Sequence, residues 1–186
     1  MGKRSKKNVG SIRRWQNKKT QSQNRKKKLI KKAKNEALNS IDLLSLSENL
    51  PHFLGVFSAD EISNLGFKSF PLSFIVNLAP KSHSGIHWLA IWIDQFNVEI
   101  FDSFGFLPTF WDFFPTHLLK FLNRFDLTHE IRISPVCQSP SSHNCGLFSL
   151  YFIHKRPLWS FEKCCAKISS VSFTRSFRKA CFYILK

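Results

Sequence analysis

Residues 86–93 have the sequence IHWLAIWI and are apolar at every position except His87. A short, continuous apolar run of this kind is typical of a strand that is buried on both faces of a sheet. The segment DQFN follows at 94–97, and the next β-rich run, 98–101, leads into Asp102. We therefore predict two strands joined by a hairpin turn at 94–97, with the first strand central in its sheet.

Further strands and helices are predicted on both sides of this hairpin. Residues 72–78 are rich in β-forming residues and end before Pro80, and residues 130–136 form a fourth strand candidate. A helix is predicted from Pro115 to 122, because proline suits the first helical position, and a very apolar helix is predicted over 145–153. Three more segments complete the outline: a helix at 161–168 capped by Ser160, helical apolar spacing over 30–46, and an ambiguous segment at 172–184.

Positive charge is concentrated at the N-terminus. Residues 1–34 hold 15 of the 28 Lys and Arg residues and no acidic residue, whereas the rest of the chain holds 13 basic and 12 acidic residues. The net charge of +16 thus describes a basic tail on a nearly neutral domain. Because the tail has few apolar residues, we expect it to be disordered when free, and its charge favours nucleic-acid binding or nuclear import over a purely solvated role.

The shifts in composition predict the domain organisation. We expect a basic disordered tail at 1–34, a linker helix at 35–49 and one domain at 50–186, with 20 Phe residues available for its core. The N-terminus lacks an apolar signal-peptide region, and no run reaches the roughly 18 apolar residues that span a bilayer, so we expect no membrane partner. The five cysteines are odd in number and show no CxxC spacing, which favours reduced thiols in an intracellular setting.

Cys145 combines several features of a cysteine nucleophile. It lies where the polar loop 138–144 meets the apolar helix predicted over 145–153, and the positive end of a helix favours the reactive thiolate. Such a thiolate also needs an imidazole as base and a third group that orients the imidazole. His87 and Asp102 would lie side by side if their strands are antiparallel neighbours, with Asp102 fixing the imidazole tautomer.

Acyl transfer also requires hydrogen-bond donors for an oxyanion. Gln138 lies seven residues before Cys145 and is able to direct its amide at the nucleophile, while the backbone N–H of Cys145 would be the second donor. Gly146 would let a substrate approach the first helical turn closely. Each residue alone also fits a structural role, because lone cysteines are usually core residues, Asp102 is able to start a turn at 103–105, and Gln138 is able to be a loop residue. The joint order favours the catalytic interpretation.

Four motifs together resemble the adenovirus proteases and related proteases of Polinton/Maverick-type virus-like elements. The motifs are His87-Trp88, FDSFGF at 101–106, Gln138 and NCGLF at 144–148. The resemblance extends over about residues 50–155. The same His–Asp–Gln–Cys order also resembles the ubiquitin-like-specific (SUMO) proteases of the same broad clan.

The resemblance implies a fold and a role for each motif residue. It implies an α+β fold of the papain-like, adenain type, in which a central mixed or antiparallel sheet is flanked by helices. His87 would be the general base, Asp102 the orienting acid, Gln138 the oxyanion donor and Cys145 the nucleophile. The implied activity is that of a cysteine endopeptidase that cleaves precursor or structural proteins of a virus or virus-like element, in the host nucleus or in the particle. By analogy, DNA bound through residues 1–34 would stimulate it.

The chain also departs from the adenovirus enzyme, and other functions stay open. Asp102 stands where that enzyme has Glu. Leu127 stands at about the position where that enzyme has the cysteine that tethers an activating peptide through a disulfide. One alternative is an isopeptidase for a ubiquitin-like protein, and another is an inactive, domesticated protease that binds nucleic acid. A metal site is a weaker hypothesis, because the residues that could bind a metal ion do not have a usual zinc spacing. These residues are Cys137, His143, Cys164 and Cys165. We therefore predict no metal ion and no cofactor that the sequence requires.

Overall fold

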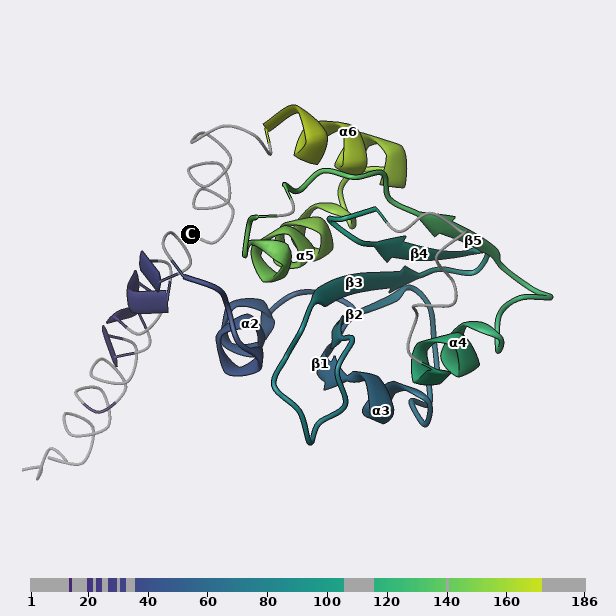
Figure 1. The fold of residues 1–186 in the computed structure, drawn as a ribbon, viewed down its shortest axis with the longest axis horizontal. Helices are drawn as coiled ribbons and strands as arrows, with labels where there is room; N and C mark the ends of the chain where they lie inside the picture. Colours follow the sequence, from purple (N-terminus) through teal and green to yellow (C-terminus); the bar gives the residue numbers. More distant parts are fainter. Residues whose placement is uncertain are drawn as a thin grey trace, which may run out of the picture.

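The computed structural model describes residues 36–105, 116–139 and 141–171, together with scattered residues between 14 and 32. Its centre is a mixed five-stranded sheet with helices on both faces (Figure 1), which confirms the predicted α+β fold. The strands are β1 (Phe53–Ser58), β2 (Leu72–Asn77), β3 (Trp88–Ile93), β4 (Asn97–Phe101) and β5 (Glu130–Ile133). The helices are α2 (Ser40–Ser47), α3 (Ala59–Ile62), α4 (Thr116–Leu122), α5 (Cys145–Lys155) and α6 (Phe161–Val171).

The strands lie in the order of the chain, from β1 to β5, so that β3 is central as predicted. β3 pairs with β2 and with β4 in antiparallel register, whereas the outer strands β1 and β5 are parallel to their neighbours. The predicted hairpin turn closes where Asp94 N–H donates to Asn97 O at 3.0 Å. β1 was not predicted as a strand, because Gly55 and a register shift between Phe53 and Val56 interrupt its pattern.

The side chains of β3 alternate between two layers of core. Leu89, Ile91 and Ile93 pack with side chains of α3 and α4 on one face. Ala90 and Trp92 pack with side chains of α2, α5 and α6 on the other face. Burial on both faces explains why the sequence of this strand is continuously apolar.

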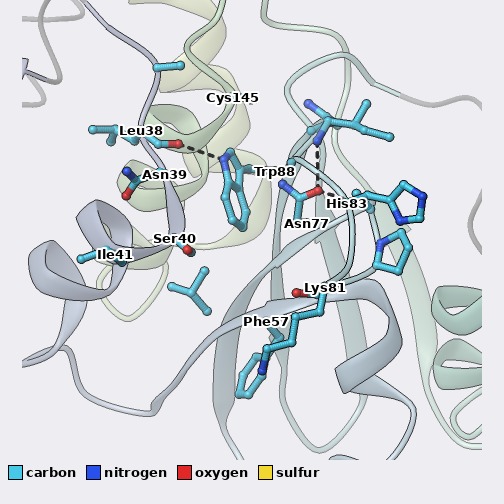
Figure 2. Close-up of a pocket in the computed structure, with 18 of the residues that line it drawn as sticks. Leu38, Asn39, Ser40, Ile41, Phe57, Asn77, Lys81, His83, Trp88 and Cys145 are labelled. Atoms are coloured by element: carbon cyan, nitrogen blue, oxygen red, sulfur yellow. Dashed lines mark hydrogen bonds between the residues drawn. The ribbon is translucent and has the colours of Figure 1, made fainter.

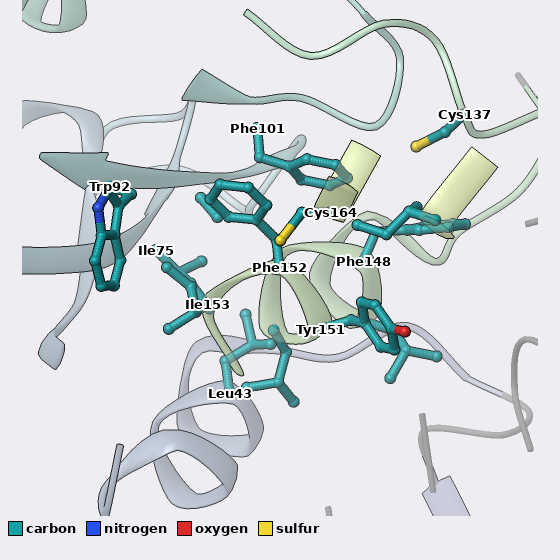
Figure 3. Packing of buried hydrophobic residues seen from close by; sticks show 14 of the residues in the cluster. Leu43, Ile75, Trp92, Phe101, Cys137, Phe148, Tyr151, Phe152, Ile153 and Cys164 are labelled. Carbon is teal, nitrogen blue, oxygen red and sulfur yellow. The ribbon is translucent and has the colours of Figure 1, made fainter. Parts of the chain in front are cut away.

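α5 lies within the second of these layers and is buried over most of its length. Figure 3 shows Phe152 of α5 beside Phe101 of β4, and their rings stack with centroids 4.8 Å apart. Burying one aromatic or aliphatic side chain of this size stabilises a fold by about 1.5–3 kcal/mol. A further hydrogen bond, from Ser149 Oγ to Trp88 O at 3.2 Å, joins the first half of α5 to the start of β3. The start of the helix is therefore fixed against the central strand.

α2 packs as part of the same core rather than as a separate connector. Asn39 caps the helix, and Asp42 returns a hydrogen bond to the backbone of Asn39, which completes a capping box. Leu43 and Leu46 are buried in the layer that contains α5. The helix predicted as a linker over 35–49 thus contributes to the core, while the domain limits themselves stay predictions.

Several elements differ in length from the prediction. β3 begins at Trp88, so His87 precedes the strand instead of lying inside it. β5 ends at Ile133, earlier than predicted, because Pro135 has no N–H group to continue the ladder. No helix in the described residues is both long and apolar enough to cross a bilayer. The predictions for Pro115, Cys181 and 172–184, and most of those for 1–34, fall outside the described residues.

Candidate active site

A cleft of about 860 Å³ opens beside the start of α5, and both His87 and Cys145 line it. Figure 2 shows its walls, which come from the start of α2, from β1 and from the loop before β3. One wall is fixed by Trp88, whose indole N–H donates to Leu38 O at 3.0 Å. The cleft therefore gives an extended ligand access to both residues.

Cys145 is the first residue of α5, and its thiol is only partly buried. The backbone N–H groups of Gly146 and Trp88 hydrogen-bond to its sulfur. Burial alone would raise the pKa of the Cys145 thiol, but the hydrogen bond and positive charge of His87, together with these two N–H groups, lower it below the ordinary value. The thiolate predicted at a helix start thus has three sources of stabilisation.

His87 is buried between Asp102 and Cys145. Its Nε2–H group donates to Asp102 Oδ1 at 2.8 Å, and the ring also interacts with the side chain of Cys145. The ring of Phe104 covers the imidazole, with centroids 4.7 Å apart. Burial alone would lower the pKa of His87, but the bonds to Asp102 and Cys145 outweigh it and raise the pKa to about 9.

Asp102 makes contacts both within its own turn and with His87. It follows β4 directly and starts a turn in which its Oδ1 accepts from Phe104 N–H at 2.8 Å, while the same oxygen holds His87. Its backbone is anchored by Ser134, whose Oγ accepts from Asp102 N–H at 2.8 Å and donates to Asp102 O at 2.7 Å. The carboxylate therefore has a fixed direction toward the imidazole.

Gln138 is buried near the same residues but is not part of the cleft lining. Its Oε1 accepts from Ser103 Oγ at 2.6 Å, and its Nε2 donates to Ser142 O at 2.7 Å. Ser142 does line the cleft. Because an amide nitrogen carries two hydrogens, one N–H of Gln138 remains for another acceptor.

The structure thus brings together three of the four predicted residues in direct contact and places the fourth one hydrogen bond behind the cleft. This arrangement is able to hold a thiolate–imidazolium pair, as acyl transfer to sulfur requires. The sequence did not reveal Ser103 or Ser134, because their partners lie 35 and 32 positions away along the chain. The sequence contains one indication of such a contact, which is that a polar residue, Ser103, follows Asp102 in the turn motif.

Comparison with known proteins identifies a family. Residues 53–169 match the sequence profile of the family described as adenovirus endoprotease. The chain belongs to the adenovirus endoprotease family. The protease of fowl adenovirus A serotype 1 (strain CELO / Phelps) is 32% identical over 123 residues, which cover 60% of this chain and 58% of the relative. The protease of ovine adenovirus D serotype 7 (isolate OAV287) is 30% identical over 132 residues, which cover 66% of this chain and 63% of the relative.

Two further comparisons concern the length of the chain and its fold. The chain spans less than two thirds of the length of these adenovirus relatives. Among solved structures, the ASFV pS273R protease is similar with a TM-score of 0.51 and 14% identity, over 80% of this chain and 66% of that chain. At this identity the likeness concerns the fold, and it agrees with a sheet flanked by helices.

Proposed function

We propose that this member of the adenovirus endoprotease family is a cysteine endopeptidase. Cys145 is its nucleophile, His87 its general base, Asp102 the group that orients His87, and Gln138 a donor to the oxyanion. The observation that carries the proposal is the position of one imidazole, which bonds to a carboxylate through Nε2 and interacts with the thiol of a helix-start cysteine, at an open cleft that both residues line.

The chemistry follows from these positions. The Cys145 thiolate attacks the carbonyl carbon of the scissile peptide, and the oxyanion that forms is bound by the N–H of Cys145 and by Gln138. The C–N bond then breaks as the imidazolium of His87 gives its proton to the leaving amine. His87 next takes a proton from water, the hydroxide attacks the thioester, and release of the acid product restores the thiolate and the imidazolium.

The substrate class and setting are part of the same proposal. Membership of the family supports precursor or structural proteins of a virus or virus-like element as substrates. The 15 basic residues of 1–34 support a nucleic-acid partner and an intracellular location, in the host nucleus or in a particle. The proposed mechanism uses side chains and backbone groups of the chain and requires no metal ion, and DNA bound through residues 1–34 would stimulate it.

The test is cleavage of a mixed peptide library by the full chain, analysed by mass spectrometry. We expect defined cleavage sites with the unchanged protein and no cleavage with Cys145→Ala. The matched control is Cys165→Ala, which removes a buried thiol of α6 outside the cleft and should keep the same sites. Cleavage that survives Cys145→Ala would overturn the proposed nucleophile.

A further inference from the structure

Two segments that are far apart in the sequence run side by side behind the cleft. Ser134 N–H donates to Ile100 O at 3.0 Å, and the N–H groups of Cys137 and Gln138 both donate to Ser103 O, at 2.9 and 2.8 Å. One carbonyl, that of Ser103, thus accepts two backbone hydrogen bonds. The backbone of Gln138 is therefore held by the turn that begins at Asp102.

The same serine also holds the side chain of Gln138. Ser103 is 1% exposed and Gln138 is 2% exposed, and the Ser103 hydroxyl donates to Gln138 Oε1 at 2.6 Å. On the other side of the amide stands Ser142 O, which is only able to accept, so the amide nitrogen must face it. The two contacts together allow one orientation of the amide.

From these contacts we propose that Ser103 is a positioning residue, which sets the amide of Gln138 for oxyanion binding. The inference rests on the proposed function of Gln138. Without the hydroxyl, Gln138 Oε1 would be buried with no donor, and only the contact of the amide nitrogen with Ser142 O would be left to hold the amide in place. A rotated amide would present an oxygen, which repels an oxyanion, where a nitrogen is needed.

On this proposal, one turn positions both the general base and the oxyanion donor. Asp102 of this turn orients His87, and the next residue, Ser103, orients Gln138. The general base and the oxyanion donor are therefore held by adjacent residues. A change confined to the Ser103 hydroxyl should affect oxyanion binding while leaving the thiolate–imidazolium pair unchanged.

Two small probes of Cys145 separate these effects. p-Nitrophenyl acetate acylates the thiolate through an oxyanion, whereas iodoacetamide alkylates it by displacement of iodide and forms no oxyanion. Both rates are measured on the full chain, with the modified cysteine located by mass spectrometry. The rates are compared under conditions in which circular dichroism shows every variant folded, because the thiolate of an unfolded chain also reacts with both reagents and has no oxyanion donor. The variants are Ser103→Ala, Gln138→Ala, the double variant, and Ser47→Ala as a control that removes another buried serine hydroxyl.

Removing one oxyanion donor typically costs on the order of 10²–10³ in rate. We expect Ser103→Ala to lower the acylation-to-alkylation ratio by roughly tenfold or more, because the donor is misdirected rather than lost. The double variant should be no slower in acylation than Gln138→Ala alone, and Ser47→Ala should keep the original ratio.

Three results would overturn the inference: an unchanged ratio in Ser103→Ala, independent multiplying losses in the double variant, or an equal fall in alkylation. Failure of the proposed function would look different. In that case the unchanged protein would cleave no peptide, or Gln138→Ala would acylate at the original rate.

Discussion

On the proposed mechanism, the coupling between His87 and Cys145 governs the chemistry at the scale of single residues. Each charge stabilises the other: the imidazolium lowers the pKa of the thiol, and the thiol together with Asp102 raises the pKa of the imidazole to about 9. The reactive ion pair therefore exists between the lowered pKa of Cys145 and the raised pKa of His87.

This coupling predicts a bell-shaped dependence of kcat/KM on pH. Activity should fall on the acid side as the Cys145 thiolate takes up a proton, at a pH below the ordinary pKa of a cysteine thiol. It should fall on the alkaline side near pH 9, as His87 loses its proton. The matched variant Asp102→Asn removes the carboxylate, so the alkaline limb should move to lower pH. Two results would contradict the coupling: a profile without an alkaline limb below pH 10, or an alkaline limb that Asp102→Asn shifts by less than about one pH unit.

The sequence was sufficient to predict the candidate catalytic residues and insufficient to predict the groups that hold them. The prediction of His87, Asp102 and Cys145 rested on their joint order along the chain and on the resemblance of the motifs that contain them. Ser103 and Ser134 were not, since serine is common in loops and their hydrogen bonds join segments that only the folded chain brings together. The exact reach of Gln138 was also not predictable, because burial behind Ser142 depends on loop packing.

At the scale of elements, the turn after β4 has almost no space between itself and the segment that follows β5. Gly105 has a φ of +61°, and a Cβ atom added there would lie 2.3 Å from the backbone nitrogen of Val136. That contact lies two positions before Gln138. Glycine is therefore needed at this position both for its conformation and for its size.

We predict that Gly105→Ala forces the two segments apart and disturbs Gln138. Its free energy of unfolding should fall by about 1–3 kcal/mol, because φ strain and a backbone clash add together. Peptide cleavage should fall by at least an order of magnitude, roughly as for loss of an oxyanion donor. The control is Gly66→Ala, which has no heavy atom within 4 Å of the added Cβ and should change stability by less than about 1 kcal/mol.

Urea unfolding and peptide cleavage check this prediction together. If Gly105→Ala matches the Gly66→Ala variant in both measurements, the close packing of the turn has no bearing on the site.

Elements were predicted well where burial was two-sided, as in β3 and α5. β1 was missed, since a glycine and a bulge leave a strand with little periodicity to detect.

At the scale of the whole molecule, the basic region at 1–34 and the candidate active site lie in different parts of the chain. The last residues of the basic region also contact the domain: Leu29 packs on the core, and Lys32 bonds to Asp42 at 2.6 Å. A deletion that stops at residue 26 removes ten of the 15 basic residues and keeps both contacts. This design separates the role of charge from that of packing.

We predict that deleting residues 1–26 abolishes DNA binding and leaves proteolysis measurable. The physical reason is that counterion release from phosphates scales with the number of basic contacts, so affinity for DNA should also fall steeply with salt in the full chain. Fluorescence anisotropy with a DNA duplex at two salt concentrations measures the first effect, and cleavage of the peptide library measures the second.

The outcome is informative in either direction. DNA affinity that survives the deletion would place the binding surface in the domain, and loss of proteolysis would indicate an enzyme that depends on DNA.

The fold class of the sheet was predictable, but the order of its strands was not. The parallel pairing of β1 with β2 and of β5 with β4 leaves no local pattern in the sequence.

The chain order of the cleft residues has a consequence for biosynthesis. α5 follows all five strands, so a ribosome releases the complete sheet, with His87 and Asp102, before it releases Cys145. A nascent polypeptide would thus carry a base with nothing to activate. On the proposed mechanism, cutting begins only once translation has passed the helix and the helix has docked, which protects the products of unfinished synthesis from attack.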